Sequence, residues 1–253
     1  MKLIANRLKA GLKAGQRQIG LWCTIPDTGV VEMLAACSYD WLLIDTEHAA
    51  MSAVDTTPLM QAAAAYPVST VVRPGWNDPV EIKKILDCGA QSLLIPYVQN
   101  AEEAAAAVAA TRYPPEGIRG VAGTTRASRY GLIKGYTQTA SQEICVLVQA
   151  ETAEALGNLE AIAAVDGVDG VFIGPADLAA SMGHTGNPGH PDVTAAILDA
   201  MARLKAMGVP GGILSLEPTL LRQAEAAGAQ FIAVGLDMAL LRDQALARRS
   251  DWV

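Results

Sequence analysis

Charged and polar side chains directly follow several short apolar runs of this chain. In chain order they are Asp45, Glu47 and His48, then Arg73, then Gln149 and Glu151, and last Asp177. Carboxylates hold divalent cations, an imidazole moves protons, and a guanidinium stabilises an oxyanion. If a fold brings the ends of these runs to one place, the sequence predicts an enzyme site there.

Two of the acids suit a metal ion. Glu151 and Asp177 end consecutive apolar runs, so we expect them to be neighbours. Adjacent carboxylates repel each other unless a cation or a proton lies between them. Ligation by oxygen alone favours Mg²⁺, Mn²⁺ or a similar ion such as Co²⁺, whereas zinc prefers His or Cys ligands and only His48 is at hand. A structural acid paired with Arg73 is the alternative.

Alternation along a strand groups the polar residues further. Positions two apart share a face, so Gln149 should point the same way as Glu151. Asp45 should point with Glu47 for the same reason, and His48 follows in the loop. We therefore expect these five side chains to meet in one cavity.

The turn Gly174-Pro175-Ala176-Asp177 predicts an anion site. If a helix begins there, the free amides of Ala176 and Asp177 lie at its positive end and attract a small carboxylate. Arg73 would add a permanent positive charge for an enolate oxygen. These features together favour a small, metal-chelated 2-oxo acid as the ligand.

The elements that must position these residues alternate between apolar runs and helical stretches. We predict strands at 19–25, 41–47, 69–74, 92–98, 144–151, 170–174, 211–215 and 231–237, and clear helices at 30–36, 79–88, 101–111, 152–164, 191–207, 218–227 and 238–248. Eight such units predict a single (β/α)8 barrel domain over residues 1–253, whose catalytic residues lie at the carboxyl ends of the strands. The competing doubly wound sheet lacks a G-x-G-x-x-G after its first strand. The Gly- and Pro-rich stretch 113–131 is either a functional loop or a surface excursion.

The composition, and the absence of certain residue types from key positions, exclude other classes of protein. The 253 residues are 51% hydrophobic with a net charge of -7, and no apolar run reaches the roughly 18–20 residues of a membrane span. There is no basic stripe for nucleic acid, and the four scattered cysteines indicate neither a disulfide framework nor structural zinc. We expect a soluble, cytoplasmic protein. No lysine ends a strand, which argues against Schiff-base chemistry, and no Gly-rich phosphate cradle follows the last two strands.

Four motifs resemble one known family. They are W-L-L-I-D-T-E-H at 41–48, R-Y-P-P-E-G-I-R-G at 112–120, V-L-V-Q-A-E-T at 146–152 and G-V-D-G-V-F-I-G-P-A-D-L at 167–178. Together they resemble the HpcH/HpaI aldolases, the metal-dependent (class II) pyruvate aldolases. The resemblance covers nearly the whole chain. It implies a barrel with a swapped C-terminal helix, a homo-hexamer, and reversible cleavage of 4-hydroxy-2-oxo acids to pyruvate and an aldehyde through a metal-stabilised pyruvate enolate, as in the catabolism of aromatic compounds.

The resemblance also implies roles for residues. Glu151 and Asp177 would hold the metal, Gln149 and the backbone of 174–177 would orient pyruvate, and Arg73 would bind its keto oxygen.

The remaining implied roles concern proton transfer and the aldehyde. His48 would act as general base through a metal-bound water, oriented by Asp45 or by Asp87, which could reach it across a subunit contact. Leu214 would line the aldehyde pocket. The stretches 214–217 and 123–125 depart from the family pattern and leave the natural aldehyde open. Two other functions are weighed: a CoA-ester lyase related to citrate lyase subunits, and a non-catalytic barrel that binds an oxo acid.

Overall fold

Eight parallel strands close into a barrel in the computed structural model of the chain, which describes residues 1–253. Each strand pairs with the next one along the chain, and the last pairs with the first. The strands are β1 (Gln18–Cys23), β2 (Trp41–Asp45), β3 (Ser69–Arg73), β4 (Ser92–Ile95), β5 (Cys145–Ala150), β6 (Gly170–Ile173), β7 (Gly211–Leu214) and β8 (Ala229–Leu236). The predicted (β/α)8 barrel is confirmed.

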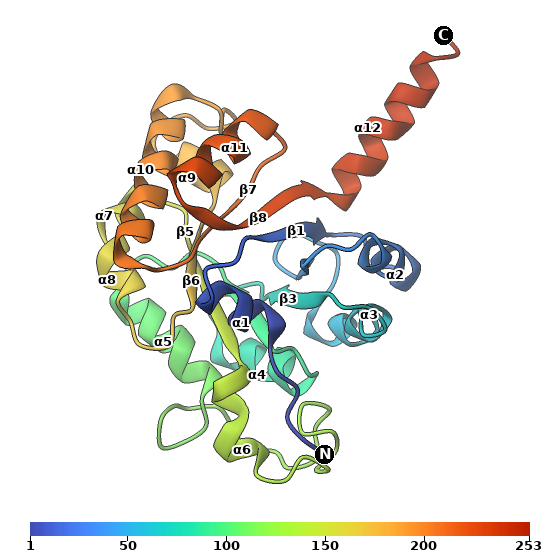
Figure 1. Cartoon of the computed structure of the whole chain (residues 1–253), viewed down its shortest axis with the longest axis vertical. Coiled ribbons are helices and arrows are strands. Elements are labelled where there is room, and N and C mark those ends of the chain that lie inside the picture. Colours follow the sequence, from blue (N-terminus) through green and yellow to red (C-terminus); the bar gives the residue numbers. More distant parts are fainter.

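Helices surround the barrel (Figure 1). They are α1 (Arg7–Lys13), α2 (Thr28–Ala36), α3 (Thr56–Ala63), α4 (Pro79–Asp87), α5 (Ala101–Thr111), α6 (Tyr136–Thr139), α7 (Ala153–Gly157), α8 (Leu159–Ala163), α9 (Pro175–Ser181), α10 (Pro191–Met207), α11 (Pro218–Ala227) and α12 (Asp237–Ser250), with 3-10 turns at Ala53–Asp55 and Ala140–Glu143. No helix is both long and apolar enough to cross a bilayer.

The core has two layers, because each strand is covered on both faces. The outer layer of 52 buried residues lies between the strands and the helices. The inner layer of 12 fills the barrel itself, and Leu8 and Leu12 of α1 belong to it. Glycines make room for its aromatic rings: a Cβ atom at Gly20 would overlap the Trp41 ring, and one at Gly212 would overlap Phe231. The barrel interior is therefore packed, and only its ends are available for ligands.

Local signals act where they were predicted at several helix ends. The Asp78 side chain accepts hydrogen bonds from the backbone of Val80 (2.9 Å) and Glu81 (2.8 Å), so it caps the start of α4. Gly208 ends α10 with a φ of 71°, a conformation that favours glycine. Backbone hydrogen bonding thus stops these helices as the sequence indicates.

The boundaries differ from prediction in two respects. All eight strands stop one to three residues before their predicted carboxyl ends, because the chain there leaves the sheet to form the mouth of the barrel. The predicted helix 152–164 is broken at Asn158 into α7 and α8. The side-chain Nδ2 of Asn158 donates to the backbone oxygen of Gln99 (2.9 Å), and the preceding Gly157 weakens the helix.

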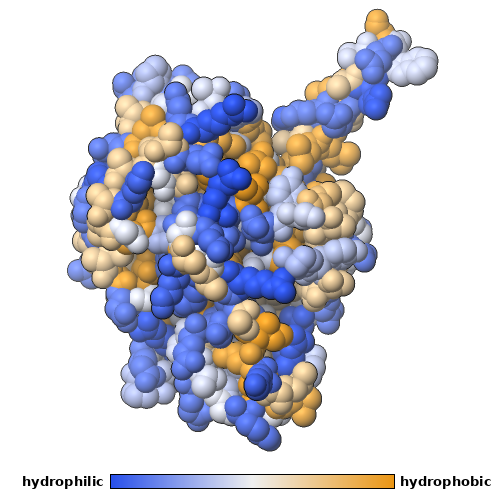
Figure 2. Space-filling model, viewed as in Figure 1, coloured by the Kyte–Doolittle hydropathy of each residue, from blue (hydrophilic) through white to orange (hydrophobic).

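The last helix, α12, leaves the barrel and extends into solvent (Figure 1). Its apolar side chains Leu240, Leu241 and Leu246 are 45%, 61% and 59% exposed. Figure 2 shows hydrophobic atoms at the foot of this helix, beside the barrel. At its start, Asp237 accepts hydrogen bonds from the backbone of Thr24 and Ile25, which anchors α12 to the loop after β1.

Candidate active site at the carboxyl ends of the strands

Arg73 is the centre of a buried polar network at the barrel mouth. Its Nε lies 2.9 Å from Asp45 Oδ1 and its Nη2 lies 2.5 Å from Asp45 Oδ2, a two-pronged pair between adjacent strands. Its Nη1 donates to Gln149 Oε1 (3.3 Å) and lies 2.7 Å from Glu47 Oε2. The Arg73 side chain is only 9% exposed. Its charge is therefore held in one place by three partners from β2 and β5 and the residues that follow β2.

Glu151 is held on both sides. Gln149 Nε2 donates to Glu151 Oε2 (2.7 Å), and the Tyr97 amide donates to Glu151 Oε1 (2.9 Å). Gly174 is needed beside it, because a Cβ atom there would overlap Glu151 Oε2. The contact between Gln149 and Glu151 confirms that these two side chains face the same way, as alternation predicts.

Burial raises the pKa of two acids of the mouth, and their neighbours' negative charges add to the effect. Burial raises the pKa of Glu151 to about 7, and the negative charges of Asp177 and Glu47 add to the effect. Burial also raises the pKa of Glu47, which outweighs the attraction of Arg73. Burial acts on Asp45 too, but the hydrogen bonds and charge of Arg73 more than offset it and the pKa of Asp45 is lowered. Asp45 and Arg73 thus form a fully charged ion pair. The negative charge of Glu151 and its acidic neighbours is not neutralised by that pair.

The negative charge that Arg73 does not neutralise would attract a hard divalent cation. Glu151 repels both Asp177 and Glu47 electrostatically, and all three side chains offer carboxylate oxygens. A cation would relieve the repulsion that raises these pKa values. The donor set therefore suits the predicted metal.

The turn from β6 into α9 lies beside these acids. Gly174 caps α9, and Pro175, Ala176 and Asp177 form its first turn. The first amides of a helix have no partner within the helix, so the backbone of Ala176 and Asp177 offers donors next to Glu151. The predicted helix start at this turn is confirmed.

Residues 18–244 match the family described as HpcH/HpaI aldolase/citrate lyase. The chain belongs to the HpcH/HpaI family. It is 62% identical over 252 residues to the hydroxypyruvate/pyruvate aldolase of Sagittula stellata, with 100% of both chains covered. It is 53% identical to the 4-hydroxy-2-oxo-heptane-1,7-dioate aldolase of Salmonella dublin, covering 96% of this chain and 94% of that one. The solved structure of a family protein from Burkholderia cenocepacia superposes with a TM-score of 0.93 at 40% identity, covering 98% of this chain and 100% of the other.

These relatives confirm the predicted class. The chain is an aldolase, a carbon–carbon lyase of the pyruvate aldolase group. The CoA-ester lyase and the non-catalytic barrel are not favoured, since the relatives at 53–62% identity are named aldolases.

His48 stands at the rim of this HpcH/HpaI site. Its side chain is 66% exposed, and its Nε2 lies 3.9 Å from Glu47 Oε1. Asp45 Oδ1 accepts from the backbone amides of Glu47 (3.0 Å) and His48 (3.4 Å), so Asp45 fixes the loop and not the imidazole ring. Within one chain, neither of the two acids considered for orienting the ring contacts it.

Asp87 lies away from the mouth, at the last residue of α4. Its Oδ1 pairs with Arg119 Nη2 at 2.7 Å. Arg119 is fully buried and its guanidinium lies over the ring of Tyr113, 4.6 Å from the centroid. Arg119 thus connects the stretch 113–131 to the C-terminal end of α4. A role for Asp87 at a mouth requires the mouth of another subunit.

Three residues of the mouth had no assigned role from sequence. Glu47 was expected to point inward, and the structure makes it a partner of Arg73. Trp22 donates through Nε1 to Asp45 Oδ2 (3.2 Å) and supports the Arg73 guanidinium, 5.3 Å from its ring centroid. Tyr97 holds Glu151 through its backbone, a contact that side-chain identity does not reveal.

Leu214 and Asp237 lie at the carboxyl ends of β7 and β8. Leu214 ends β7 and packs against the inner core, as a residue bordering the mouth should. Asp237, which also follows a strand, accepts from the backbone and hydroxyl of Thr24 and from Ile25. It is a structural acid, so charge after a strand does not by itself identify a catalytic residue.

Proposed function

We propose that the chain, acting as one domain over residues 1–253, reversibly cleaves 4-hydroxy-2-oxo acids to pyruvate and an aldehyde with a divalent metal ion. The observation that carries this is the buried mouth, where a fixed guanidinium faces a group of carboxylates with surplus negative charge. The S. dublin relative is named for a 4-hydroxy-2-oxo dicarboxylate, and the S. stellata relative for hydroxypyruvate and pyruvate.

Glu151 and Asp177 would hold the metal, which is Mg²⁺, Mn²⁺ or Co²⁺ by the oxygen donors available. When bound, the ion supplies Lewis acidity toward the keto oxygen of the substrate. Gln149 orients Glu151 through the 2.7 Å hydrogen bond between them. Since a ligating carboxylate must be ionised, binding of the ion also lowers the pKa that burial raises.

The chain's own groups bind and orient the oxo acid. The backbone amides of Ala176 and Asp177 donate hydrogen bonds to the carboxylate of the oxo acid, and Gly174 and Pro175 shape the turn that presents them. Arg73 Nη1 lies on the side of the guanidinium that faces Gln149 and Glu47, and it would donate to the keto oxygen of the substrate. Negative charge develops on that oxygen as the C3–C4 bond breaks. Asp45 and Trp22 hold the guanidinium plane in position, so only the partners of Nη1 have to change when the keto oxygen binds.

His48 would accept the proton that the reaction releases. Removal of the C4 hydroxyl proton allows C4 to become the aldehyde carbon, and the electron pair of the C3–C4 bond moves to the pyruvate half, which is protonated at C3 afterwards. The exposed imidazole of His48 stands at the rim where that hydroxyl would lie, with Glu47 near its Nε2. Leu214 would contact the aldehyde half.

Two measurements test this function. Pyruvate release from 4-hydroxy-2-oxo acids of different tail length and charge should stop in EDTA and return with Mg²⁺ or Mn²⁺. Pyruvate alone in D₂O should exchange its methyl protons, as an enolising enzyme requires. Cleavage that is indifferent to EDTA contradicts the metal, and the absence of both activities contradicts the aldolase.

The extended α12 supports a homo-hexamer with the C-terminal helix swapped between subunits. Its leucines are exposed in one chain, although apolar side chains are normally covered. Leu241→Asp should dissociate the assembly in sedimentation velocity runs, whereas Val54→Asp, at an apolar residue 64% exposed elsewhere on the surface, should not. An unchanged mass for both variants contradicts a contact through α12.

A further inference from the structure

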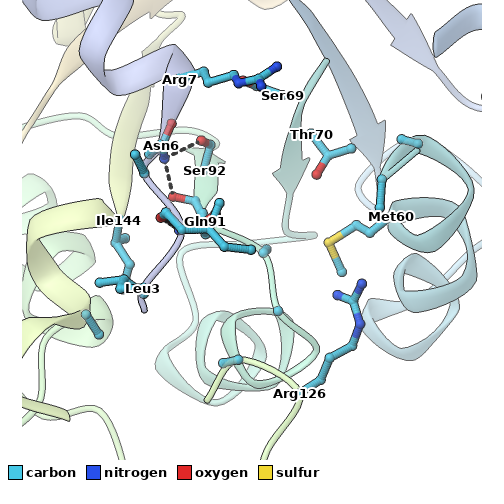
Figure 3. A pocket seen from close by; sticks show the side chains of 18 of the residues that line it. Leu3, Asn6, Arg7, Met60, Ser69, Thr70, Gln91, Ser92, Arg126 and Ile144 are labelled. Atoms are coloured by element: carbon cyan, nitrogen blue, oxygen red, sulfur yellow. Dashed lines mark hydrogen bonds between the residues drawn. The ribbon is translucent and has the colours of Figure 1, made fainter. Parts of the chain in front are cut away.

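A cavity of about 290 Å³ lies at the opposite end of the barrel from the mouth. It is bordered by the first residues of β3 and β4, by the chain before α1 and by the segment 126–133 (Figure 3). Ser69 and Thr70, which border it, begin the same strand that ends in Arg73. The cavity is therefore separate from the site that binds the oxo acid.

The charged side chains around this cavity are all positive. Arg7, Arg126 and Arg129 border it, and no Asp or Glu does. Arg7 and Arg129 form no ion pair and donate no side-chain hydrogen bond within the chain, and Arg126 donates only to the Cys88 carbonyl (2.8 Å). In a chain with a net charge of -7, three guanidinium groups without a carboxylate partner border this one cavity. They make a local positive potential that attracts anions.

The structure holds Arg126 in place at the cavity wall. It packs against the backbone of Gly89, where a Cβ atom would overlap Arg126 Nη1, and burial together with the charge of Arg129 lowers its pKa. In Figure 3 the Arg126 side chain points toward Met60 and Thr70, and Arg7 lies at the far edge beside Ser69. Hydroxyl groups and guanidinium groups thus line the same space from different elements.

The cavity is also apolar over much of its wall. Fourteen of its 23 bordering residues are hydrophobic, and the buried side chains of Met60, Ile133 and Ile144 are among them. Small-molecule sites combine such a wall with a few convergent polar groups. An inorganic ion would leave this wall uncovered, whereas a carboxylate on a short apolar body would contact both parts.

We propose that this cavity is a binding site for a small organic anion, a carboxylate with a short acyl or aryl body, distinct from the catalytic mouth. The Arg126 guanidinium binds the carboxylate, and the charges of Arg129 and Arg7 add to the positive potential around it. The apolar body packs on the wall formed with Met60 and Ile144. The proposal does not depend on which oxo acid the mouth cleaves.

The test is calorimetric titration of the full chain, with Mg²⁺ and pyruvate present in excess to fill the mouth. The probes are acetate, butyrate, hexanoate and inorganic phosphate. Affinity should rise about fourfold for each methylene group buried, so hexanoate should bind much more tightly than acetate or phosphate. Equal affinity for all four probes, or no binding of hexanoate, overturns the proposal.

Variants locate the site. Arg7→Gln/Arg129→Gln removes two positive charges that support no internal contact, and it should weaken hexanoate binding at least tenfold. Arg17→Gln/Arg222→Gln removes the same charge from residues that do not border the cavity and should leave the affinity within twofold. A crystal grown with 4-bromobenzoate should show the anomalous bromine signal inside this cavity, against its apolar wall and away from the Arg126 guanidinium. Equal weakening by both double variants, or a bromine signal found only elsewhere, overturns the assignment.

Discussion

The two ends of the barrel each carry an ion pair, and the pairs differ in burial. At the mouth, Arg73 pairs with Asp45 and Glu47, and the Arg73 side chain is 9% exposed. At the amino-terminal end, Lys9 pairs with Asp169 at 3.1 Å, with the two side chains 25% and 20% exposed. The first network has perturbed pKa values and a surplus of acid, whereas the second is a single pair in partial contact with water.

This difference shows how one fold separates chemistry from stability. Buried charges interact strongly because water does not screen them, and they perturb each other's protonation. Partly exposed charges interact weakly. Reacting groups must lie in the buried environment, so the mouth destabilises the fold. Apolar packing at the amino-terminal end, such as that of Leu8 and Leu12, offsets this cost.

The largest expected effect is at Arg73. Arg73→Ala leaves Asp45 and Glu47 buried without their partner, so it should lower the free energy of unfolding by about 3–5 kcal/mol and cleavage by about a hundredfold or more. Urea unfolding and pyruvate release measure the two losses. Arg203→Gln, at an exposed pair with Glu160, should cost no more than about 1 kcal/mol. Equal losses for both variants would remove the contrast between buried and exposed pairs.

The next effect is at Gly174. Gly174→Ala should displace the Glu151 carboxylate, because the new methyl group overlaps its Oε2. We expect at least a tenfold loss of cleavage and weaker Mg²⁺ binding, measured by pyruvate release and by calorimetry. Gly157→Ala is the control, since a Cβ atom there meets nothing within 4 Å. Full activity of Gly174→Ala would show that the acid tolerates another position.

The pH dependence of stability sharpens the comparison further. The folded pKa of Glu151, about 7, lies above the ordinary value of 4.5, so the folded chain holds this proton more tightly than the unfolded chain. The stabilising contribution is full below pH 4.5 and is lost as the pH rises through 7, a change of about 3 kcal/mol. In EDTA, Glu151→Gln should abolish this part of the pH profile, whereas the exposed Glu154→Gln should keep it. Thermal unfolding between pH 5 and 8 measures it, and parallel profiles for all three proteins would contradict the raised pKa.

The smallest effect is expected at Lys9. Lys9→Met removes the pair with Asp169 and the hydrogen bond to the Ile144 carbonyl, and it should cost about 1 kcal/mol with cleavage within twofold of the parent. Urea unfolding and pyruvate release are again the measurements. A loss of activity comparable to that of Arg73→Ala would show that the two ends are not independent.

Periodicity and local caps predicted most of the architecture. Parallel strands covered on both faces are continuous apolar runs, and Trp41-Leu42-Leu43-Ile44 could be recognised as one without any tertiary information. Asp78 before Pro79 predicted the start of α4 because capping depends on adjacent residues alone. The break at Asn158 was missed, because its competing contact with Gln99 is distant in sequence.

The candidate site was predicted in part for the same reason. Alternation placed Gln149 with Glu151 and Asp45 with Glu47, since side-chain direction along a strand is a local property. The tight pairing of Asp45 with Arg73, and the position of Asp87 against Arg119, depend on which segments meet in space. Asp237 shows the converse, an acid after a strand that serves only to anchor α12.

By itself, then, the order of residues determined the barrel and the kinds of group at its mouth, because hydrophobic alternation and helix capping act over a few positions. Only the tertiary structure decided which carboxylate pairs with Arg73 and which carboxylates carry surplus negative charge. It also decided that Arg7 borders the same cavity as Arg126 and Arg129, more than a hundred residues away in sequence. Those outcomes depend on burial and on distances between segments, and the interaction of charges follows distance in space and not separation along the chain.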